Sequence, residues 1–203
     1  MERRPATIQD IPLISRIHAA SWKAAYNGMI PQAYLDALPE DHWVESFTKW
    51  LQAGALQALI AWEGDAAVGC ISFGKPVSVS GLKELPAGCG EIRSLYILPE
   101  YMRRGYGKAL LHDAELALRI QGFSHCSLYV LEQNLSARAF YEKNGYARDG
   151  ASASFRILDQ DMTELRYVKS LACPCPRRCK THGDCTACKE KHTKKKYPCY
   201  CLR

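Results

Sequence analysis

An α/β (α+β) fold, with a central mixed sheet flanked by helices, is predicted by two features of the sequence. The first is the order of the elements: strands of a hairpin come early, strand and helix then alternate, and an antiparallel pair closes the globular part. The second is residues 126–131, a near-continuous apolar run typical of a strand covered on both faces. Together they indicate a sheet with parallel and antiparallel neighbours.

The individual elements follow from local patterns. Thr7 and Asp10 have capping-box-like spacing ahead of apolar residues at a helical period, from Ile11 to Ile17. Gly145 is expected to end a short helix in the left-handed conformation. The remaining expectations are helices at 31–38, 41–52, 107–121 and 136–144, strands at 56–62, 67–73, 91–98, 126–131 and 163–168, another strand from 146, and a loop at 76–90.

Charge and cysteine content divide the 203 residues near position 169. Residues 169–203 carry ten Lys or Arg and two acidic residues, a balance of +8, whereas residues 1–168 have 17 basic and 19 acidic side chains, a balance of −2. Seven of the ten cysteines also follow position 172. We therefore expect a globular domain at 1–168 and a small basic, cysteine-rich module at 169–203.

The distribution of apolar residues indicates where in the cell the protein is expected. No run approaches the roughly 20 apolar residues that a membrane span requires, and the N-terminus lacks the apolar stretch of a secretory signal. The expectation is a cytoplasmic protein without membrane association. The oligomeric state is not legible in the sequence.

The segment 91–108 predicts a phosphate-binding turn. An apolar strand leads into a loop in which Gly105 and Gly107 allow a tight turn, and an amphipathic helix follows directly. Unpaired amides of the first helical turn and the helix dipole favour an anion there, and Arg103, Arg104 and Lys108 add positive charge. Taken alone, such a turn also fits an ordinary strand-to-helix connection with solvated basic residues.

Two motifs give the sequence a family resemblance. Residues 102–107 match the pattern Q/R-x-x-G-x-G/A, except that Met102 stands in the first place. Residues 134–146, Asn-x-x-Ala-x-x-Phe-Tyr-x-Lys-x-Gly-Tyr, match a second motif, and residues 21–31 match one branch of the same group. In these features residues 4–168 resemble the GNAT superfamily of N-acetyltransferases. The resemblance implies acetyl-CoA as substrate, a primary amine as acceptor, and direct transfer between them.

The resemblance also implies roles for single residues. Tyr141 would be the general acid for the departing thiolate, and Glu91 would be the base, although a solvent-facing carboxylate at the strand end is an open alternative. The main chain of Leu95, Tyr96 and Ile97 would hold the pantetheine arm and the acetyl carbonyl. The residues implied for the pyrophosphate are Met102, Arg103, Arg104, Gly105, Tyr106, Gly107 and Lys108, with Asn134 on the arm of the coenzyme.

Three further residues, Trp22, Tyr26 and Cys126, could belong either to the site or to the core. Trp22 and Tyr26 lie where the acceptor groove is walled in the family, but aromatic residues at helical spacing also fit core packing. Cys126 is expected to be buried packing, because direct transfer needs no nucleophile.

The C-terminal module predicts a zinc site. Seven cysteines and two histidines fall within 29 residues that hold few other apolar side chains, and Cys-x2-Cys knuckles place two sulfurs on one ion. The candidate ligands are Cys173, Cys175, Cys179, His182, Cys185, Cys188, His192, Cys199 and Cys201. A disulfide cluster is the alternative, disfavoured by the odd count and the interspersed histidines. The +8 charge suggests nucleic acid, the ribosome or an acidic protein as partner, and an acyl-CoA-sensing binding module is the alternative to an enzyme.

Overall fold

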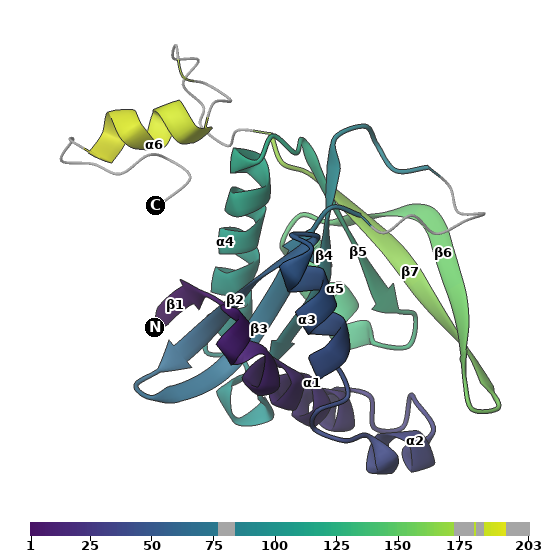
Figure 1. Ribbon diagram of the computed structural model, residues 1–203. Coiled ribbons are helices and arrows are strands. Elements are labelled where there is room, and N and C mark those ends of the chain that lie inside the picture. Colours follow the sequence, from purple (N-terminus) through teal and green to yellow (C-terminus); the bar gives the residue numbers. More distant parts are fainter. Residues whose placement is uncertain (77–83, 173–180, 182–184, 194–203) are drawn as a thin grey trace.

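One mixed sheet of seven strands, in the order β1-β2-β3-β4-β5-β7-β6, forms the centre of the protein (Figure 1). The computed structural model describes residues 1–76, 84–172, 181 and 185–193. The strands are β1 Glu2–Pro5, β2 Leu56–Glu63, β3 Ala66–Gly74, β4 Cys89–Ile97, β5 His125–Leu131, β6 Ala147–Ile157 and β7 Gln160–Ser170. The helices are α1 Ile11–Ala25, α2 Gln32–Ala37, α3 Val44–Gln52, α4 Tyr106–Ile120, α5 Leu135–Lys143 and α6 Cys185–Thr193, with short 3-10 turns at Ile8–Asp10 and Pro99–Tyr101.

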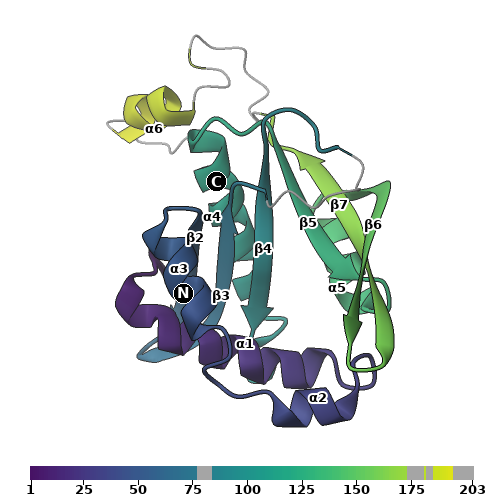
Figure 2. The same ribbon diagram turned by 45° about the vertical axis from the view of Figure 1, so that its right-hand side comes forward.

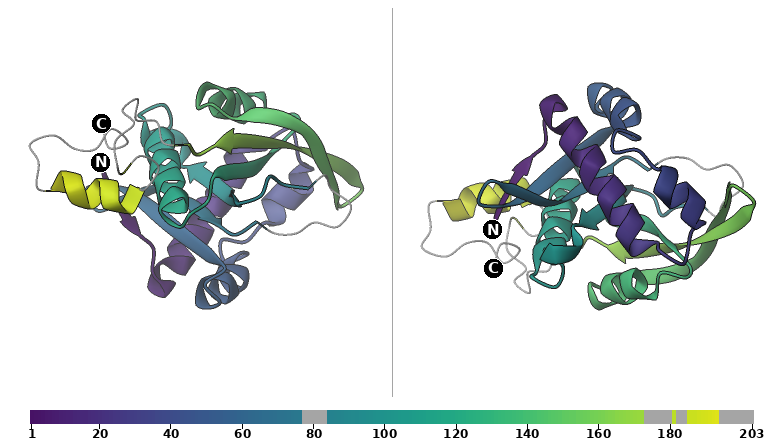
Figure 3. Two further views of the ribbon diagram at one scale, coloured as in Figure 1. Left: turned by 90° about the horizontal axis from the view of Figure 1, so that it is seen from above. Right: turned by 90° about the horizontal axis from the view of Figure 1, so that it is seen from below.

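Helices cover both faces of the sheet, as the sequence predicted. α1 and α3 lie on one face and α4 and α5 on the other (Figure 3). The larger core joins the sheet to α4 and α5, and a second core packs α1 and α3 on β2 and β3. α4 approaches β4 closely at Gly90, where an added Cβ would lie 2.8 Å from Cδ2 of Leu118. Glycine at this position therefore allows the helix to pack directly on the strand.

Two of the strands, β1 and β4, differ from the sequence-based expectation for identifiable reasons. β1 was not predicted, because its residues Glu2–Pro5 are polar and mostly exposed at the edge of the sheet, where they pair with β2. β4 begins at Cys89, inside the expected loop, because Cys89 and Gly90 pair with His125 and Cys126 of β5. Both differences come from strand pairing between distant segments, which local patterns do not report.

The sheet opens between its two central parallel strands. β4 pairs with β5 only from Cys89 to Glu91, where Glu91 stands opposite Ser127. Beyond that point the two strands diverge, and the gap widens toward their C-terminal ends (Figure 2). A bulge in β4 accompanies the divergence, since Ser94 pairs with Ser72 and Ile92 with Phe73, leaving Arg93 without a partner in β3. One edge of β4 is therefore not paired with β5 beyond Glu91.

The C-terminal segment joins the domain along α4. The main core extends past the predicted boundary to Leu171, which is 2% exposed and whose amide donates to the Ser124 carbonyl at 2.8 Å. Cys188 of α6 packs against Leu116 of α4. Among the described residues, none of the helices is long and apolar enough to cross a membrane.

Candidate active site

The loop between β4 and α4 with the first turn of that helix, residues 102–108, is called the cradle, because the sequence predicts that it binds an anion. Arg103 has φ 60° and Gly105 has φ 91°, so left-handed residues alternate along the loop. Gly105 is the N-cap of α4 and provides no side-chain acceptor, which leaves the amides of the first turn to a ligand. Such a run of inward-facing amides at a helix N-terminus binds phosphate oxygens. The helix begins at Tyr106, one residue earlier than predicted.

Glu63, at the end of β2, holds two side chains of this loop. Its carboxylate accepts hydrogen bonds from the Tyr106 hydroxyl and, at 3.3 Å, from Nη1 of Arg104. The Arg104 guanidinium also lies 5.2 Å from the centre of the Tyr101 ring. No local pattern pointed to Glu63, because the residues that it binds lie 41 and 43 positions away. Tyr106 therefore offers its main chain, rather than its hydroxyl, to the cradle.

The basic residues of the cradle, Arg103, Arg104 and Lys108, differ in whether they form an ion pair. Arg104 forms an ion pair with Glu63 at 3.3 Å. Within the part of the chain that the structure describes, Arg103 and Lys108 have no ion-pair partner. Arg103 and Lys108 therefore differ from Arg104, whose charge is paired with Glu63.

The free edge of β4 leads from this cradle into the gap. Leu95, Tyr96 and Ile97 all lie beyond the last pair between β4 and β5. Leu95 and Ile97 pack with the core under α4, and Tyr96 packs with the core under α1. The cradle and this edge are adjacent, since a Cβ on Gly107 would lie 3.6 Å from Cγ1 of Ile97.

Two aromatic side chains at the C-terminal end of α1, Trp22 and the capping residue Tyr26, contact Tyr96 of β4. Nε1 of Trp22 donates to the Tyr96 hydroxyl at 2.7 Å, and the Tyr26 hydroxyl lies 3.3 Å from the same oxygen. Burial raises the pKa of Tyr96 and of Tyr26, so both phenols stay protonated at neutral pH. Trp22 and Tyr26 also pack in a small core with residues of β5, β6 and β7. The two expectations for them, packing and a place beside the site, are thus compatible.

Tyr141 reaches the same region from α5. Its side chain is 8% exposed and packs against the rings of Phe140 and Tyr146. Burial, with a smaller electrostatic contribution from Tyr26, raises the pKa of Tyr141 well above its usual range. Tyr141 also contributes electrostatically to the raised pKa of Tyr96. A protonated phenol therefore stands near the free edge of β4, as a general acid requires.

Glu91 occupies the point at which the sheet opens. It is 9% exposed, and it pairs with Gly74 of β3 and Ser127 of β5. The expected alternative, a carboxylate facing solvent, is therefore wrong. Glu164 of β7, which the sequence did not single out, lies within electrostatic range: burial and then the charge of Glu91 raise its pKa. The carboxyl groups of Glu91 and Glu164 thus lie near each other where β4 and β5 separate.

Asn134 has a structural role that the motif did not specify. It is the N-cap of α5, and its Oδ1 accepts a hydrogen bond from the amide of Ala137 at 3.0 Å. Its predicted contact with the arm of the coenzyme stays a prediction. Cys126 is fully buried, and burial raises the pKa of its thiol to about 12, which confirms it as packing.

The predicted zinc ligands fall mainly outside the described residues. This applies to Cys173, Cys175, Cys179, His182, Cys199 and Cys201, and of Cys185 only its place in α6 is described. Cys188 and His192 lie four residues apart on α6. Among the described residues no cluster of three or more His, Cys, Asp or Glu side chains is placed to hold a metal. The zinc site and its ligand partition stay predictions.

The geometry defines an α/β protein that offers a phosphate cradle beside an open strand edge lined by tyrosines. Residues 22–146 match the acetyltransferase (GNAT) family. The chain therefore belongs to the acetyltransferase (GNAT) family of enzymes, as its motifs indicated.

Similar proteins agree with this assignment. The spermidine N(1)-acetyltransferase of Thermoplasma acidophilum is 26% identical over 162 residues, covering 79% of this chain and 96% of that protein. An uncharacterized N-acetyltransferase of Bacillus subtilis, YuaI, is 34% identical over 140 residues, covering 68% and 76%. The crystal structure of the PaiA N-acetyltransferase of Thermoplasma acidophilum in complex with coenzyme A superposes with a TM-score of 0.65 at 25% identity, covering 84% and 99%.

Proposed function

We propose that this enzyme transfers the acetyl group of acetyl-CoA directly to a primary amine. The observation that carries the proposal is the adjacency of the cradle, the free edge of β4 and the α5 helix. A Cβ on Gly107 would lie 3.6 Å from both Ile97 and Phe140, the neighbour of Tyr141. A diphosphate held at 102–108 therefore leaves its thioester arm beside β4, within reach of the tyrosines.

The residues present fit coenzyme A. The uncapped first turn of α4 and the left-handed residues before it offer amides to the diphosphate, and the unpaired edge at Leu95–Ile97 offers main-chain groups to the pantetheine arm. The relative from Thermoplasma acidophilum was crystallised with coenzyme A. In this proposal Met102 contributes its backbone, so its departure from the family pattern has little consequence.

Two proton transfers complete the reaction. The amine forms the new N–C bond as the C–S bond breaks, Glu91 accepts the proton that the amine loses, and Tyr141 gives a proton to the thiolate sulfur. Glu91 suits the first role because it is buried at the opening of the sheet, and Tyr141 suits the second because its raised pKa keeps it protonated. Tyr96 and Tyr26 are protonated phenols at neutral pH, so in this proposal they do not compete with Glu91 for the proton of the acceptor amine.

The acidic residues favour a cationic acceptor that carries more than one amino group. Glu91 and Glu164 lie within electrostatic range of each other, and Glu164 also acts on Tyr26. A second ammonium group of the acceptor would offset the charge of Glu164 while the reacting amine approaches Glu91. Spermidine, the substrate in the name of one relative, has this chemistry. We therefore place the acceptor among the diamines and polyamines.

The test is turnover of acetyl-CoA with a panel of amines. Polyamines are expected to be acetylated with a kcat/KM about tenfold or more above that of monoamines of equal length. Glu164→Gln should remove most of that preference by raising KM for polyamines alone. Glu142→Gln, on α5, where the carboxylate accepts a hydrogen bond from the Tyr167 hydroxyl, is the matched control. Absence of any coenzyme A binding in calorimetry would refute the proposal and leave the alternative acyl-CoA-sensing role without support as well.

The C-terminal module is proposed as a zinc-bound, basic appendage on the strength of its sequence. Its ten Lys or Arg residues make nucleic acid, the ribosome or an acidic protein its candidate partners. Elemental analysis should find about one or two zinc ions per chain in the full-length protein. A metal content well below one would refute the zinc site, and a gel shift unchanged by deletion of 173–203 would refute the nucleic-acid partner.

A further inference from the structure

A chain of three polar side chains lies between α1 and the sheet. Nε2 of His18 on α1 lies 3.3 Å from Oγ of Ser94 on β4, and Oγ of Ser94 lies 2.5 Å from Oγ of Ser72 on β3. His18 is 3% exposed and Ser72 is 2% exposed. A buried polar group is costly unless it is hydrogen-bonded, so these contacts satisfy groups that water does not reach. The reaction proposed above uses none of the three side chains.

Aromatic rings surround the imidazole of His18. The rings of Trp43, Phe47 and Tyr96 meet it edge-on, with centroid distances of 5.4, 5.0 and 4.6 Å. Burial lowers the pKa of His18 to about 3, so the ring is neutral at physiological pH. A neutral imidazole has one donor and one acceptor nitrogen, and a hydroxyl can act as both, so the chain stays connected in either tautomer. His18 therefore offers Ser94 an uncharged partner in a fixed place.

Ser94 directly follows the bulge of β4. The extra residue of the bulge is Arg93, and Ser94 is the first residue after it to pair with β3, opposite Ser72. Residues Leu95–Ile97 come next, and none of them pairs with β5. Their main chain is the part of β4 to which the proposed function assigns the acetyl carbonyl. The position of the bulge thus determines the direction in which these main-chain groups point.

The polar chain fixes the position of that bulge. Side chains alternate between the two faces of a strand, so a bulge displaced by one residue toward the C-terminus would turn Ser94 away from α1. The other face of β4 packs in the apolar core under α4. His18 would then lose its partner, and a hydroxyl would enter that core. Both changes leave buried polar groups without hydrogen bonds, which disfavours the displaced arrangement.

We infer that His18 is a positioning residue for acetyl transfer, which fixes the bulge of β4 through Ser94 and so aligns the main-chain groups that hold the acetyl carbonyl. The inference rests on the proposed function, because that function places the carbonyl at Leu95–Ile97. His18 touches neither the coenzyme nor the acceptor in this scheme. Its loss should misplace the carbonyl and lower kcat, while the cradle at 102–108 continues to bind the coenzyme.

Two substitutions break the chain from opposite sides. His18→Phe keeps an aromatic ring in place but removes Nε2, and Ser94→Ala removes the hydroxyl that Nε2 contacts. Each should lower kcat by about tenfold or more, with the Kd for coenzyme A from calorimetry within about threefold of the unmodified protein. The double variant should lose no more than either single variant, because one broken contact already disconnects the chain. His18→Gln, whose amide can take the place of Nε2, should recover most of kcat.

Ser15→Ala is the matched control. Ser15 is buried on the same helix one turn before His18, but its Oγ bonds to the main chain of Glu40 and Trp43 instead of contacting β4. Its loss should leave kcat within about twofold of the unmodified protein. A tenfold loss in Ser15→Ala as well would assign the effect to the packing of α1 and overturn the inference.

Infrared difference spectroscopy of bound acetyl-CoA, isotope-labelled at the carbonyl, gives a readout that does not depend on turnover. Main-chain donors should shift the C=O band of the bound molecule to lower wavenumber than in free acetyl-CoA, and His18→Phe and Ser94→Ala should lose most of that shift. The shift should return in His18→Gln and persist in Ser15→Ala. An unchanged band in both His18→Phe and Ser94→Ala, or a kcat that stays within about twofold in both, would overturn the inference and leave the acetyltransferase intact. If His18→Phe does not fold, Ser94→Ala decides, since it removes a single oxygen atom. A protein that binds no coenzyme A would instead refute the proposed function.

Discussion

Nε1 of Trp22 and the hydroxyl of Tyr96 form a hydrogen bond of 2.7 Å that ties α1 to the free edge of β4. Beyond Glu91, β4 has no residue pairs with β5, and this side-chain bond links the strand to the helix on one face of the sheet. The Tyr26 hydroxyl, 3.3 Å from the same oxygen, extends the link toward β7. Aromatic side chains therefore position Tyr96 on the part of β4 that does not pair with β5.

The Trp22–Tyr96 bond predicts a measurable coupling. In a double-mutant cycle of Trp22→Phe and Tyr96→Phe, the two substitutions should be non-additive by about 1 kcal/mol in the free energy of unfolding, because either one alone breaks the bond. Denaturant unfolding measures the four variants. Additive effects within about 0.3 kcal/mol would show that the bond adds no stability. Trp62→Phe paired with Tyr96→Phe is the control cycle, since Trp62 has no hydrogen-bonding partner among the described residues.

Tyr141→Phe tests the general acid. The loss of its hydroxyl should lower kcat by about 100-fold or more, because no other group then protonates the leaving thiolate. Coenzyme A affinity by calorimetry should stay within about threefold. Tyr146→Phe is the matched control, because this tyrosine is buried and its ring packs against that of Tyr141. Its kcat should be unaffected, and equal losses in both variants would assign Tyr141 to packing.

Local sequence patterns predicted the cradle and most of the elements around it. The turn before α4 depends on Gly105 and on charges within a few positions, and α4 itself depends on apolar spacing, so each is encoded in a short window. Tyr141 follows from its place in a helix motif. These features required no knowledge of which strands pair.

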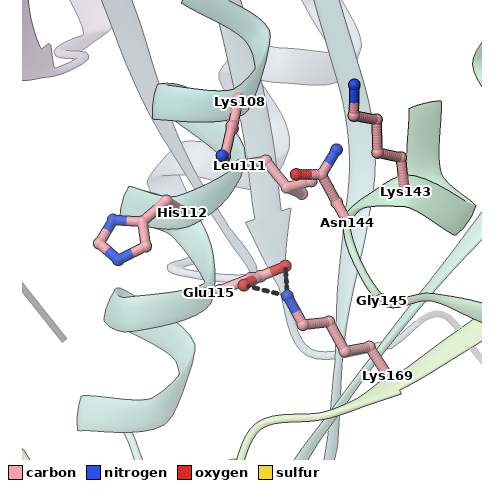
Figure 4. Close-up of a pocket in the computed structure, with 8 residues that line it drawn as sticks. All are labelled: Lys108, Leu111, His112, Glu115, Lys143, Asn144, Gly145 and Lys169. Carbon is pink, nitrogen blue, oxygen red and sulfur yellow. Dashed lines mark hydrogen bonds and ion pairs between the residues drawn. The ribbon is translucent and has the colours of Figure 1, made fainter. Parts of the chain in front are cut away.

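Features that depend on distant segments were not predictable in this way. Glu63 meets Arg104 and Tyr106 only because the β2–β3 hairpin places it beside α4. Glu164 comes near Glu91 because β7 inserts between β5 and β6. The pocket lined by Lys108, Lys143 and Lys169 likewise combines residues of α4, α5 and β7 (Figure 4). These contacts depend on the order and register of the strands, and the local periodicity of apolar residues determines neither.

Glu91→Gln separates base catalysis from substrate binding. At neutral pH kcat should fall by about 100-fold, because a neutral amide cannot take the proton of the acceptor. The deficit should shrink as pH rises toward the amine pKa of about 10, since the acceptor then arrives deprotonated. The measurement is kcat against pH for both proteins. A deficit that stays constant across pH would indicate a positioning role and remove Glu91 as the base.

His18 makes stability depend on pH. Burial lowers its pKa to about 3, and its Nε2 lies 3.3 Å from Oγ of Ser94. The unfolded chain has a histidine pKa of about 6.5 and therefore binds more protons below that value. The contribution of His18 is present above pH 6.5 and is lost as the pH falls toward 3. The free energy of unfolding should fall by about 1 kcal/mol per pH unit between pH 6 and 4.5. In His18→Gln this slope should largely vanish, whereas an unchanged slope would place its origin in other groups.

Gly105→Ala distinguishes backbone strain from ligand binding, because the chain offers a matched glycine. Gly105 and Gly122 both have φ 91°, and an added Cβ meets only Cε of Met1 at 3.9 Å in the first and nothing within 4 Å in the second. Each alanine should therefore cost a similar free energy of unfolding, roughly 1–2 kcal/mol, from its left-handed conformation. Relief of that strain shifts the cradle only at Gly105, so coenzyme A affinity should fall about tenfold or more in Gly105→Ala and stay unchanged in Gly122→Ala. Thermal unfolding and calorimetry on both variants give the comparison. Equal coenzyme A affinities in the two would mean that the turn at Gly105 serves only the fold, and the diphosphate would have to bind elsewhere.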